Sequence, residues 1–370
     1  MSAPRWLDRM PAWPLYLAVL VAFPLLVYPN EVLFRWTGIS IGGQLTYIFI
    51  YAILALGLNV VVGYTGILHL GIAAFFGIGA YVTGILTVPA YPFGVGFVAA
   101  LVLSTGAAAL AGILLGAPTL RLRGDYVAIV TLGFGEVTRF TLRNLEEITA
   151  GTRGLNPVPP PQLPAFLEPP LRLLGITPDW SLDYRLFYFL ALGLLLVVIW
   201  LLHNLEDSRL GRAWMAIRED ELAAACMGIN ASRVKLSAFA LGCGLAGMAG
   251  CLYATVLAST AGPDAFDFNR SVLMLCCIIL GGLGSLRGTL LGVLLLIGFD
   301  NVVAPVLDGF IQASGISSGD NRFLTFSNWK LMIFGLALIL MMRFRPEGLL
   351  PSRQIEAEMH TPQPLTEETA

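Results

Sequence analysis

Long apolar segments recur along almost the whole chain, and several approach the length that a helix needs to cross a membrane. A helix rises about 1.5 Å per residue, so about 20 apolar residues span the hydrocarbon core of a bilayer. Of the 370 residues, 56% are hydrophobic and only 12% are charged, and the mean hydropathy is +0.77. A water-exposed surface needs more charge than this. We therefore predict an all-α, polytopic membrane protein.

The apolar segments predict about ten transmembrane helices. The first could be a signal peptide, but no small-residue cleavage site precedes the polar break at residues 29–31, so we expect an uncleaved helix. Glycines inside the apolar segments, such as Gly242, Gly247 and Gly250, favour close packing of helix backbones. The ten predicted crossings are 13–28, 44–62, 66–88, 94–117, 125–143, 185–203, 234–258, 271–284, 288–306 and 329–342.

Basic residues are concentrated in alternate loops, which orients the chain by the positive-inside rule. This pattern places both termini in the cytoplasm, with a cytoplasmic segment at about 204–233 and a periplasmic loop at about 144–183. Residues 1–353 then form the transmembrane domain. We expect the acidic tail at 354–370 to be a disordered cytoplasmic extension, because it has little apolar content. The basic residues on the predicted inner side are Arg121, Arg123, Arg209, Arg212, Arg218, Arg233, Lys235, Arg287, Arg343, Arg345 and Arg353.

The segment 204–233 is the longest hydrophilic stretch on the predicted inner side. Leu210, Ala213, Trp214 and Ile217 follow the i, i+3, i+4, i+7 period of an amphipathic helix. Its continuation has charges first, small residues behind them, and a glycine able to end the helix. Such a helix could enter a groove in a partner protein, or it could lie against lipid headgroups as a connector. The residues of this continuation that we single out are Arg218, Glu219, Asp220, Glu221, Ala223, Ala224 and Gly228.

Glu136 is the main polar candidate within an apolar helix, because a carboxylate in lipid normally faces a bundle interior or a water-filled cavity. Arg139 follows one turn later, so an internal ion pair that fixes helix packing is at least as good an interpretation as contact with a substrate. His69 and Asn59 are further candidates for a translocation pathway. Residues of these two types in membrane helices are more often hydrogen-bonded packing residues than ligands.

Glycines and small residues interrupt the apolar segments 63–81 and 131–135, the second of which begins at Thr131. We expect broken helices there, because free backbone groups near the membrane midplane can hold a polar substrate such as a zwitterion. Close helix packing through glycine is the alternative interpretation of the same residues.

Several functions are disfavoured by what the sequence lacks. It has no GxxxxGK[ST] loop, so any ATP and its magnesium ion must be bound by a partner. It has no HExxH motif or other visible catalytic constellation, and no histidine and cysteine spacing typical of a metal site. It has no basic face, which disfavours a nucleic-acid partner. The five cysteines form no CxxC pair and are interpreted as packing residues.

Three blocks of the sequence together resemble a known family. They are GYTGILHLGIAAFFGIGAY at 63–81, RLRGDYVAIVTLGFGE at 121–136 and GRAWMAIREDELAAACMGINASRVK at 211–235. They are similar to LivM-type permeases, the branched-chain amino-acid members of the ABC importers, over roughly residues 40–350. The resemblance implies a permease of the inner (plasma) membrane that carries its ATPase coupling segment between Arg218 and Gly228. Its expected partners are a second homologous permease, two cytoplasmic ATP-binding subunits, a periplasmic or extracellular solute-binding protein and membrane lipid.

Two departures from the family pattern bear on the substrate. The chain has Gly71-Ile72 where the family usually has glycine and histidine, and Ala150-Gly151-Thr152-Arg153-Gly154 where it has Gly-Gly-Pro-Asn-Gly. A branched-chain amino acid, another amphipathic amino acid, or urea or a short amide therefore all remain candidate substrates. An ion-coupled secondary transporter is disfavoured, because Glu136 is the single clear ionisable residue in the middle of a helix.

Overall fold

The computed structural model describes residues 41–119, 126–162, 180, 184–313, 326–345 and 347–351. These residues form helices and irregular connections and no strand, so the all-α prediction is confirmed for the described part of the chain. The predicted first crossing at 13–28, residues Arg121 and Arg123, and the tail at 354–370 lie outside the described residues. So do residues 163–179 and 181–183 of the predicted periplasmic loop.

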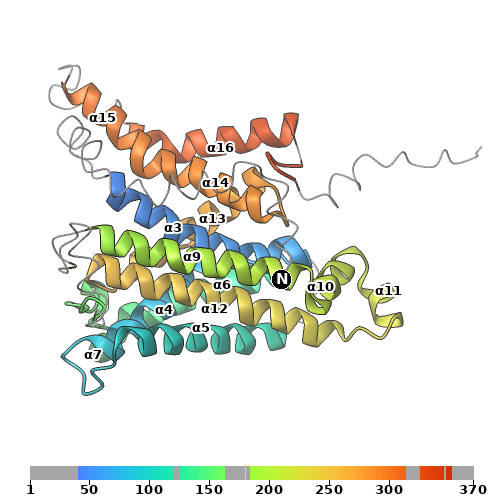
Figure 1. Ribbon diagram of the computed structural model, residues 1–370, viewed down its shortest axis with the longest axis horizontal. Helices are drawn as coiled ribbons and strands as arrows, with labels where there is room; N and C mark the ends of the chain where they lie inside the picture. Colours follow the sequence, from blue (N-terminus) through green and yellow to red (C-terminus); the bar gives the residue numbers. More distant parts are fainter. Residues whose placement is uncertain are drawn as a thin grey trace, which may run out of the picture.

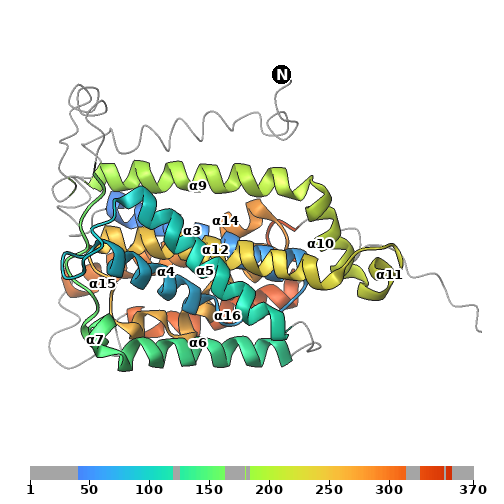
Figure 2. The ribbon, with the colours of Figure 1, turned by 90° about the horizontal axis from the view of Figure 1, so that it is seen from below.

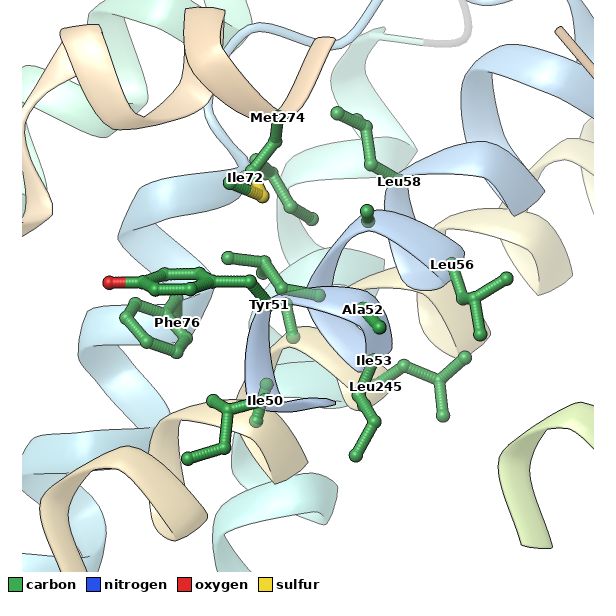
Figure 3. Packing of buried hydrophobic residues seen from close by; sticks show 14 of the residues in the cluster. Ile50, Tyr51, Ala52, Ile53, Leu56, Leu58, Ile72, Phe76, Leu245 and Met274 are labelled. Carbon is green, nitrogen blue, oxygen red and sulfur yellow. The ribbon is translucent and has the colours of Figure 1, made fainter. Parts of the chain in front are cut away.

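Two long helices, α3 (Ile41–Asn59) and α12 (Ala231–Leu257), form the centre of the bundle. Helix α12 packs against α3, α4 (Ile72–Thr87) and α5 (Phe97–Thr119), while α9 (Tyr184–Glu206) covers another side of α3 (Figures 1 and 2). Helix α3 continues into a π-helical turn, η3 (Val60–Tyr64). Figure 3 shows how the side chains of α3 fill the centre, with Ile50, Ile53 and Leu56 directed toward different neighbours.

A second group of helices packs on the side of α3 away from α12. It contains α13 (Phe268–Gly281) and α14 (Leu286–Gly298), which contact each other and α3. Helix α14 continues through the π-helical η6 (Phe299–Val303) into α15 (Ala304–Ala313), and α16 (Phe326–Phe344) packs against α13 and α15. Helix α6 (Tyr126–Asn144) lies at the periphery against α4 and the short η5 (Pro263–Phe266). The remaining short helices are α7 (Glu146–Thr149), η4 (Gly151–Arg153), α10 (Arg209–Glu219) and α11 (Glu221–Cys226).

The outer helices present apolar side chains outward, as expected for a surface in contact with lipid. The apolar window of α3 is 89% buried, whereas that of α5 is only 28% buried. Val98, Val102, Leu110 and Leu114 of α5 are all more than half exposed and recur at multiples of four residues, which places them on one helix face. An apolar face of this kind is stable against hydrocarbon or another membrane protein, and not against water.

Among the described residues, five helices are long and apolar enough to cross a membrane by themselves. Every predicted crossing after the first coincides with a helix, and α14 reaches its length only together with η6 and α15. Helices α4 and α13 are short and do not continue into another helix. Helix α4 has 16 residues and α13 has 14, which correspond to about 24 Å and 21 Å at 1.5 Å per residue. The predicted crossing at 66–88 therefore begins only at Ile72.

One predicted interruption is wrong. Helix α6 runs without a break from Tyr126 to Asn144, through the small residues at 131–135. Within a helix the backbone groups bond to one another, so glycine alone does not interrupt it in lipid. A Cβ on Gly135 would lie 3.6 Å from the Cα of Gly71, an ordinary van der Waals distance, so this contact with the neighbouring segment does not require glycine at position 135.

The predicted role of the glycines in α12 is confirmed, because they let three neighbouring helices approach its backbone. A Cβ added to Gly250 would lie 2.1 Å from the carbonyl oxygen of Phe76 in α4. One added to Gly242 would lie 2.6 Å from the carbonyl oxygen of Gly57 in α3. Real Cβ atoms do not approach other atoms so closely, so only glycine fits at these contacts.

We expect Gly250→Ala to destabilise the bundle, because its methyl group would collide with the backbone of α4. Overpacking of this kind typically costs ~1–3 kcal/mol. Gly193→Ala is the matched control, since no atom lies within 4 Å of the Cβ that it would add to α9. Thermal unfolding in detergent should show a lower midpoint for Gly250→Ala alone. Equal midpoints for both variants would contradict this account of α12 packing.

Candidate functional site

The helical run of α3 and η3 ends at Tyr64 with Thr65 as its C-cap, and residues 66–71 are not helical before α4 begins at Ile72. Residues 65–71 therefore form the predicted interruption in the segment 63–81, which is confirmed in this part. We call residues 65–71 the break. Gly66 has a φ of +70°, a conformation that favours glycine. A Cβ on Gly71 would lie 2.2 Å from the carbonyl oxygen of Thr131, so the break lies directly on the backbone of α6.

Side chains from two other helices satisfy backbone donors at the break. The N–H of Leu70 donates to Thr131 Oγ1 of α6 at 3.1 Å, and the N–H of Ala73 donates to Ser271 Oγ of α13 at 3.1 Å. Thr131 is fully buried, and its hydroxyl donates in turn to the carbonyl of Ala128. Thr131 is thus a hydrogen-bonded packing residue that fixes the break to α6.

A group of four charged residues lies along α6 and η5, and we call it the polar ladder. Arg139 Nη2 is 2.9 Å from Glu136 Oε2, which confirms the internal pair at i, i+3. Arg139 Nη1 also donates to Asp264 Oδ1 of η5 at 2.8 Å, and Arg143 Nη1 lies 3.9 Å from the same oxygen. The side chains are only partly buried, from 20% exposed for Arg139 to 63% for Asp264. The ladder carries two positive and two negative charges in one accessible row.

Asn59 and His69 belong to other contacts and do not join the ladder. Both are fully buried. Asn59 Oδ1 accepts a hydrogen bond from the N–H of Gly284 at 3.0 Å, so it holds the turn between α13 and α14. The His69 ring packs between Phe75 and Phe239, with centroid distances of 5.7 and 5.5 Å. Among the described residues no hydrogen-bond partner is found for either ring nitrogen of His69.

A separate cavity of about 440 Å³ lies between α3, α9 and α12. Its lining includes Tyr47, Trp180 and Tyr184 and contains no charged side chain among the described residues. A zwitterion needs partners for both of its charges, so this cavity suits it less well than the ladder does.

Helices α10 and α11 form an arm, residues 208–230, that extends past one end of the bundle (Figures 1 and 2). Ser208, Asp220 and Asn230 are the N-caps of α10, α11 and α12, each accepting hydrogen bonds from backbone N–H groups of the helix that follows. Trp214 and Ile217 are buried, as the amphipathic period predicted. The Trp214 Nε1–H donates to the carbonyl of Val234 at 3.0 Å, which holds α10 against the start of α12.

The predicted continuous helix from Arg218 to Gly228 is wrong, because Asp220 divides it. The extended backbone of Asp220 ends α10, and its carboxylate accepts from the N–H groups of Leu222 and Ala223 to start α11. Gly228, with a φ of +84°, follows the end of α11. Asp220 can stop one helix and start the next because its short acidic side chain competes for backbone donors.

The structure also divides the predicted coupling residues into an outward and an inward group. Glu219, Asp220, Glu221, Ala223 and Gly228 are exposed, and Glu221 pairs with Lys235 at 2.7 Å. Ala224 is buried against the chain itself, so a bulky residue there would disturb this protein before it met a partner. Arg218 is partly buried and donates to the carbonyl of Gly63.

Sequence reasoning missed three residues that matter to these sites. Asp264 completes the ladder from η5, 125 residues away from Arg139 along the chain, and no sequence signal pointed to it. Leu222 and Met227 are 79% and 84% exposed at the tip of the arm. These two apolar residues flank the small residues of a hydrophilic segment, and that pattern in the sequence could have indicated a binding surface.

Comparison with known proteins bears directly on this arrangement. The family model described as "Branched-chain amino acid transport system / permease component" matches residues 40–342. The high-affinity branched-chain amino acid transport system permease protein LivM of Salmonella typhimurium is 36% identical over 328 residues, covering 86% of this chain and 72% of that protein. LivM of Escherichia coli strain K12 is 37% identical over 316 residues, covering 83% and 69%.

A more distant relative is the permease protein LivH of the same transport system in Escherichia coli strain K12. It is 22% identical over 346 residues, which cover 87% of this chain and 96% of that protein. No solved structure matches the chain significantly.

We expect Thr131→Val to destabilise the protein, because it removes the acceptor for the Leu70 N–H in a buried position. An unsatisfied buried donor costs ~1–3 kcal/mol. Thr131→Ser keeps the hydroxyl and should restore most of the stability. The measurement is thermal unfolding of both variants in detergent, and a Thr131→Val variant as stable as the wild type would contradict this role of the hydroxyl.

Proposed function

The chain belongs to the family of branched-chain amino acid transport system permease components, and from this membership we propose that it is the transmembrane permease subunit of an ABC importer. Its cargo is a branched-chain or related amphipathic amino acid moved into the cytoplasm. The protein is a multi-pass protein of the inner (plasma) membrane and a transport subunit, not an enzyme. Energy comes from ATP and magnesium bound by partner subunits.

The arm is the observation that carries this proposal. Leu222 and Met227 are exposed at the end of a capped helix pair, and the bundle itself buries neither side chain. An apolar tip surrounded by charged residues instead fits a groove in a soluble partner. The proposed assembly contains this chain, a second homologous permease, two cytoplasmic ATP-binding subunits and a solute-binding protein outside, all within membrane lipid.

The topology follows from the position of the arm. With the arm in the cytoplasm, the opposite end of the bundle, where α7 lies, faces the periplasm (Figure 2). We retain ten crossings, both termini inside, a transmembrane domain at 1–353 and a cytoplasmic tail at 354–370 as parts of this proposal. The charge asymmetry of the loops supports it.

The polar ladder and the break are the proposed parts of the pathway. A zwitterion carries one positive and one negative charge, and the ladder offers carboxylates for the first and guanidinium groups for the second. The ladder residues are partly exposed and already paired, so the substrate exchanges one ion pair for another and no charge is left unpaired in lipid. The N-terminus of α4 begins at the break, and its dipole favours a carboxylate there.

We expect Glu136→Gln to impair transport more than folding. Arg139 keeps its bond to Asp264 in this variant, so the helix contact survives while the carboxylate for the substrate amine is lost. Uptake should fall about tenfold, which corresponds to about 1.4 kcal/mol in the barrier. The assay is ATP-dependent uptake of labelled leucine by proteoliposomes containing the whole complex, with unlabelled urea as a competitor to test the amide alternative.

The control for this experiment is Glu147→Gln, an exposed carboxylate of α7 outside the ladder. It should leave uptake unchanged. Normal uptake by Glu136→Gln, or its loss from the membrane, would make Glu136 neutral or structural. Absence of leucine uptake by the wild-type complex would contradict the proposed function itself.

We expect Leu222→Asp to detach the ATP-binding subunits. Burying a leucine side chain contributes ~1.5–3 kcal/mol, and an unpaired charge at the same contact opposes binding further. The amount of ATP-binding subunit that co-purifies should fall tenfold or more, while the permease stays monodisperse. Each tenfold loss of affinity corresponds to about 1.4 kcal/mol of binding free energy. Leu222→Met keeps an apolar tip and should bind normally. Unchanged co-purification with Leu222→Asp would exclude the arm tip as the docking surface.

A further inference from the structure

Arg218 stands at the last turn of α10, yet its side chain is directed away from the tip of the arm. Its Nη1 donates a hydrogen bond of 2.6 Å to the carbonyl oxygen of Gly63, in the π-helical turn that ends the α3 run. The last carbonyls of a helix lack partners within it, and a cation there also meets the negative end of the helix dipole. Arg218 therefore caps α3 and η3 from a different helix, 155 residues away along the chain.

Glycines from two other segments surround the Arg218 side chain. A Cβ on Gly66, in the break, would lie 3.2 Å from Arg218 Cγ. A Cβ on Gly284, in the turn between α13 and α14, would lie 3.2 Å from Arg218 Nη1. Both glycines have positive φ, of +70° and +71°. Through this one side chain the arm contacts η3, and the same side chain lies beside the break and beside the turn that precedes α14.

A second contact joins the arm to the same place. Trp214 lies one turn before Arg218 on the same face of α10, and its ring stacks on that of Tyr64 at a centroid distance of 6.2 Å and an interplanar angle of 5°. Tyr64 follows Gly63 directly. Because two side chains of α10 hold consecutive residues of η3, α10 cannot shift without moving the end of η3 or breaking both contacts.

The break connects this point to the ladder helix. It begins at Thr65, directly after η3, and ends at Gly71 against the backbone of Thr131 in α6. The Leu70–Thr131 hydrogen bond fixes that end. Glu136 and Arg139 stand on the same helix, α6, one to two turns beyond Thr131. A continuous set of contacts therefore runs from the arm through Arg218 and the break to the residues proposed for the pathway.

We propose that Arg218 is a positioning residue that transmits movement of the arm to the break and to α6, and that it does not contact the ATP-binding subunits. This inference rests on the proposed function, because it supposes that nucleotide binding moves the arm. It separates two roles within the coupling region. Leu222 and Met227 bind the partner, and Arg218 links the arm to the inner end of the pathway.

The test compares Arg218→Met with Arg212→Met in the whole complex. Methionine keeps an unbranched apolar stem like that of arginine but lacks the guanidinium group and cannot donate to Gly63. Arg212 lies exposed on the same helix and donates to the carbonyl of Asp207, so it controls for loss of a charge from α10. We expect both variants to co-purify with all partners and to hydrolyse ATP. Leucine transported per ATP hydrolysed should fall about fivefold or more in Arg218→Met alone.

The outcomes distinguish this inference from the proposed function. If the wild-type complex transports leucine and Arg218→Met does so with the same ratio, the inference is overturned. If Arg218→Met loses the ATP-binding subunits as Leu222→Asp does, Arg218 is a partner contact and the inference is also overturned. If the wild-type complex transports no leucine, the proposed function is wrong. Hydrogen–deuterium exchange then still tests the link between the arm and the break.

Hydrogen–deuterium exchange in the wild-type complex tests the link without any variant. A non-hydrolysable ATP analogue with magnesium should change the exchange of the arm, residues 208–230, and of the break, residues 65–71, together. A change in the arm with none in the break would overturn the inference. This readout also decides the matter if Arg218→Met does not fold.

Discussion

In hydrocarbon every backbone N–H and C=O group needs a hydrogen-bond partner, and the rest of this structure depends on how that need is met at the break. Thr131 and Ser271 supply acceptors from α6 and α13, and Gly71 lets the backbones approach. These bonds allow α4 to start inside the bundle. They also tie α4 to α6 and α13, so that the position of each of these helices depends on the others.

The charges of α6 are tolerated because they compensate one another. Arg139 bonds to Glu136 and to Asp264, and the four residues of the ladder sum to zero charge. A row of compensating charges is stable without a bound substrate, and its ion pairs can be exchanged for ion pairs with a zwitterion. An isolated carboxylate in lipid would have to become protonated or be hydrated. The peripheral position of α6, against α4 and η5, leaves the side chains of the ladder partly exposed.

At the other end of the molecule, the arm formed by α10 and α11 has two surfaces. Trp214 and Arg218 face the bundle, and beyond the stop at Asp220 the apolar residues Leu222 and Met227 face outward. The stop at Asp220 separates these two faces, because it ends α10 and turns the chain before α11 begins. The arm contacts the bundle at one end and exposes an apolar tip at the other. This arrangement is suited to transmit a displacement of the tip to the bundle.

The sequence by itself determined the helical membrane architecture, the close packing of α12 through Gly242 and Gly250, the interruption near Gly66 and the Glu136–Arg139 pair. These features depend on local periodicity and on residues within a few positions of one another. Only the tertiary structure decided that α6 is unbroken, that Ala224 is buried, that Asp264 completes the ladder and that Arg218 contacts Gly63. Helix α6 is unbroken because its backbone groups bond to one another despite the small residues. The Asp264 and Arg218 contacts each join residues more than a hundred positions apart, and the burial of Ala224 depends on which side of a short helix meets the bundle. Periodicity along the chain cannot predict such contacts, because they depend on how helices distant in the sequence pack together.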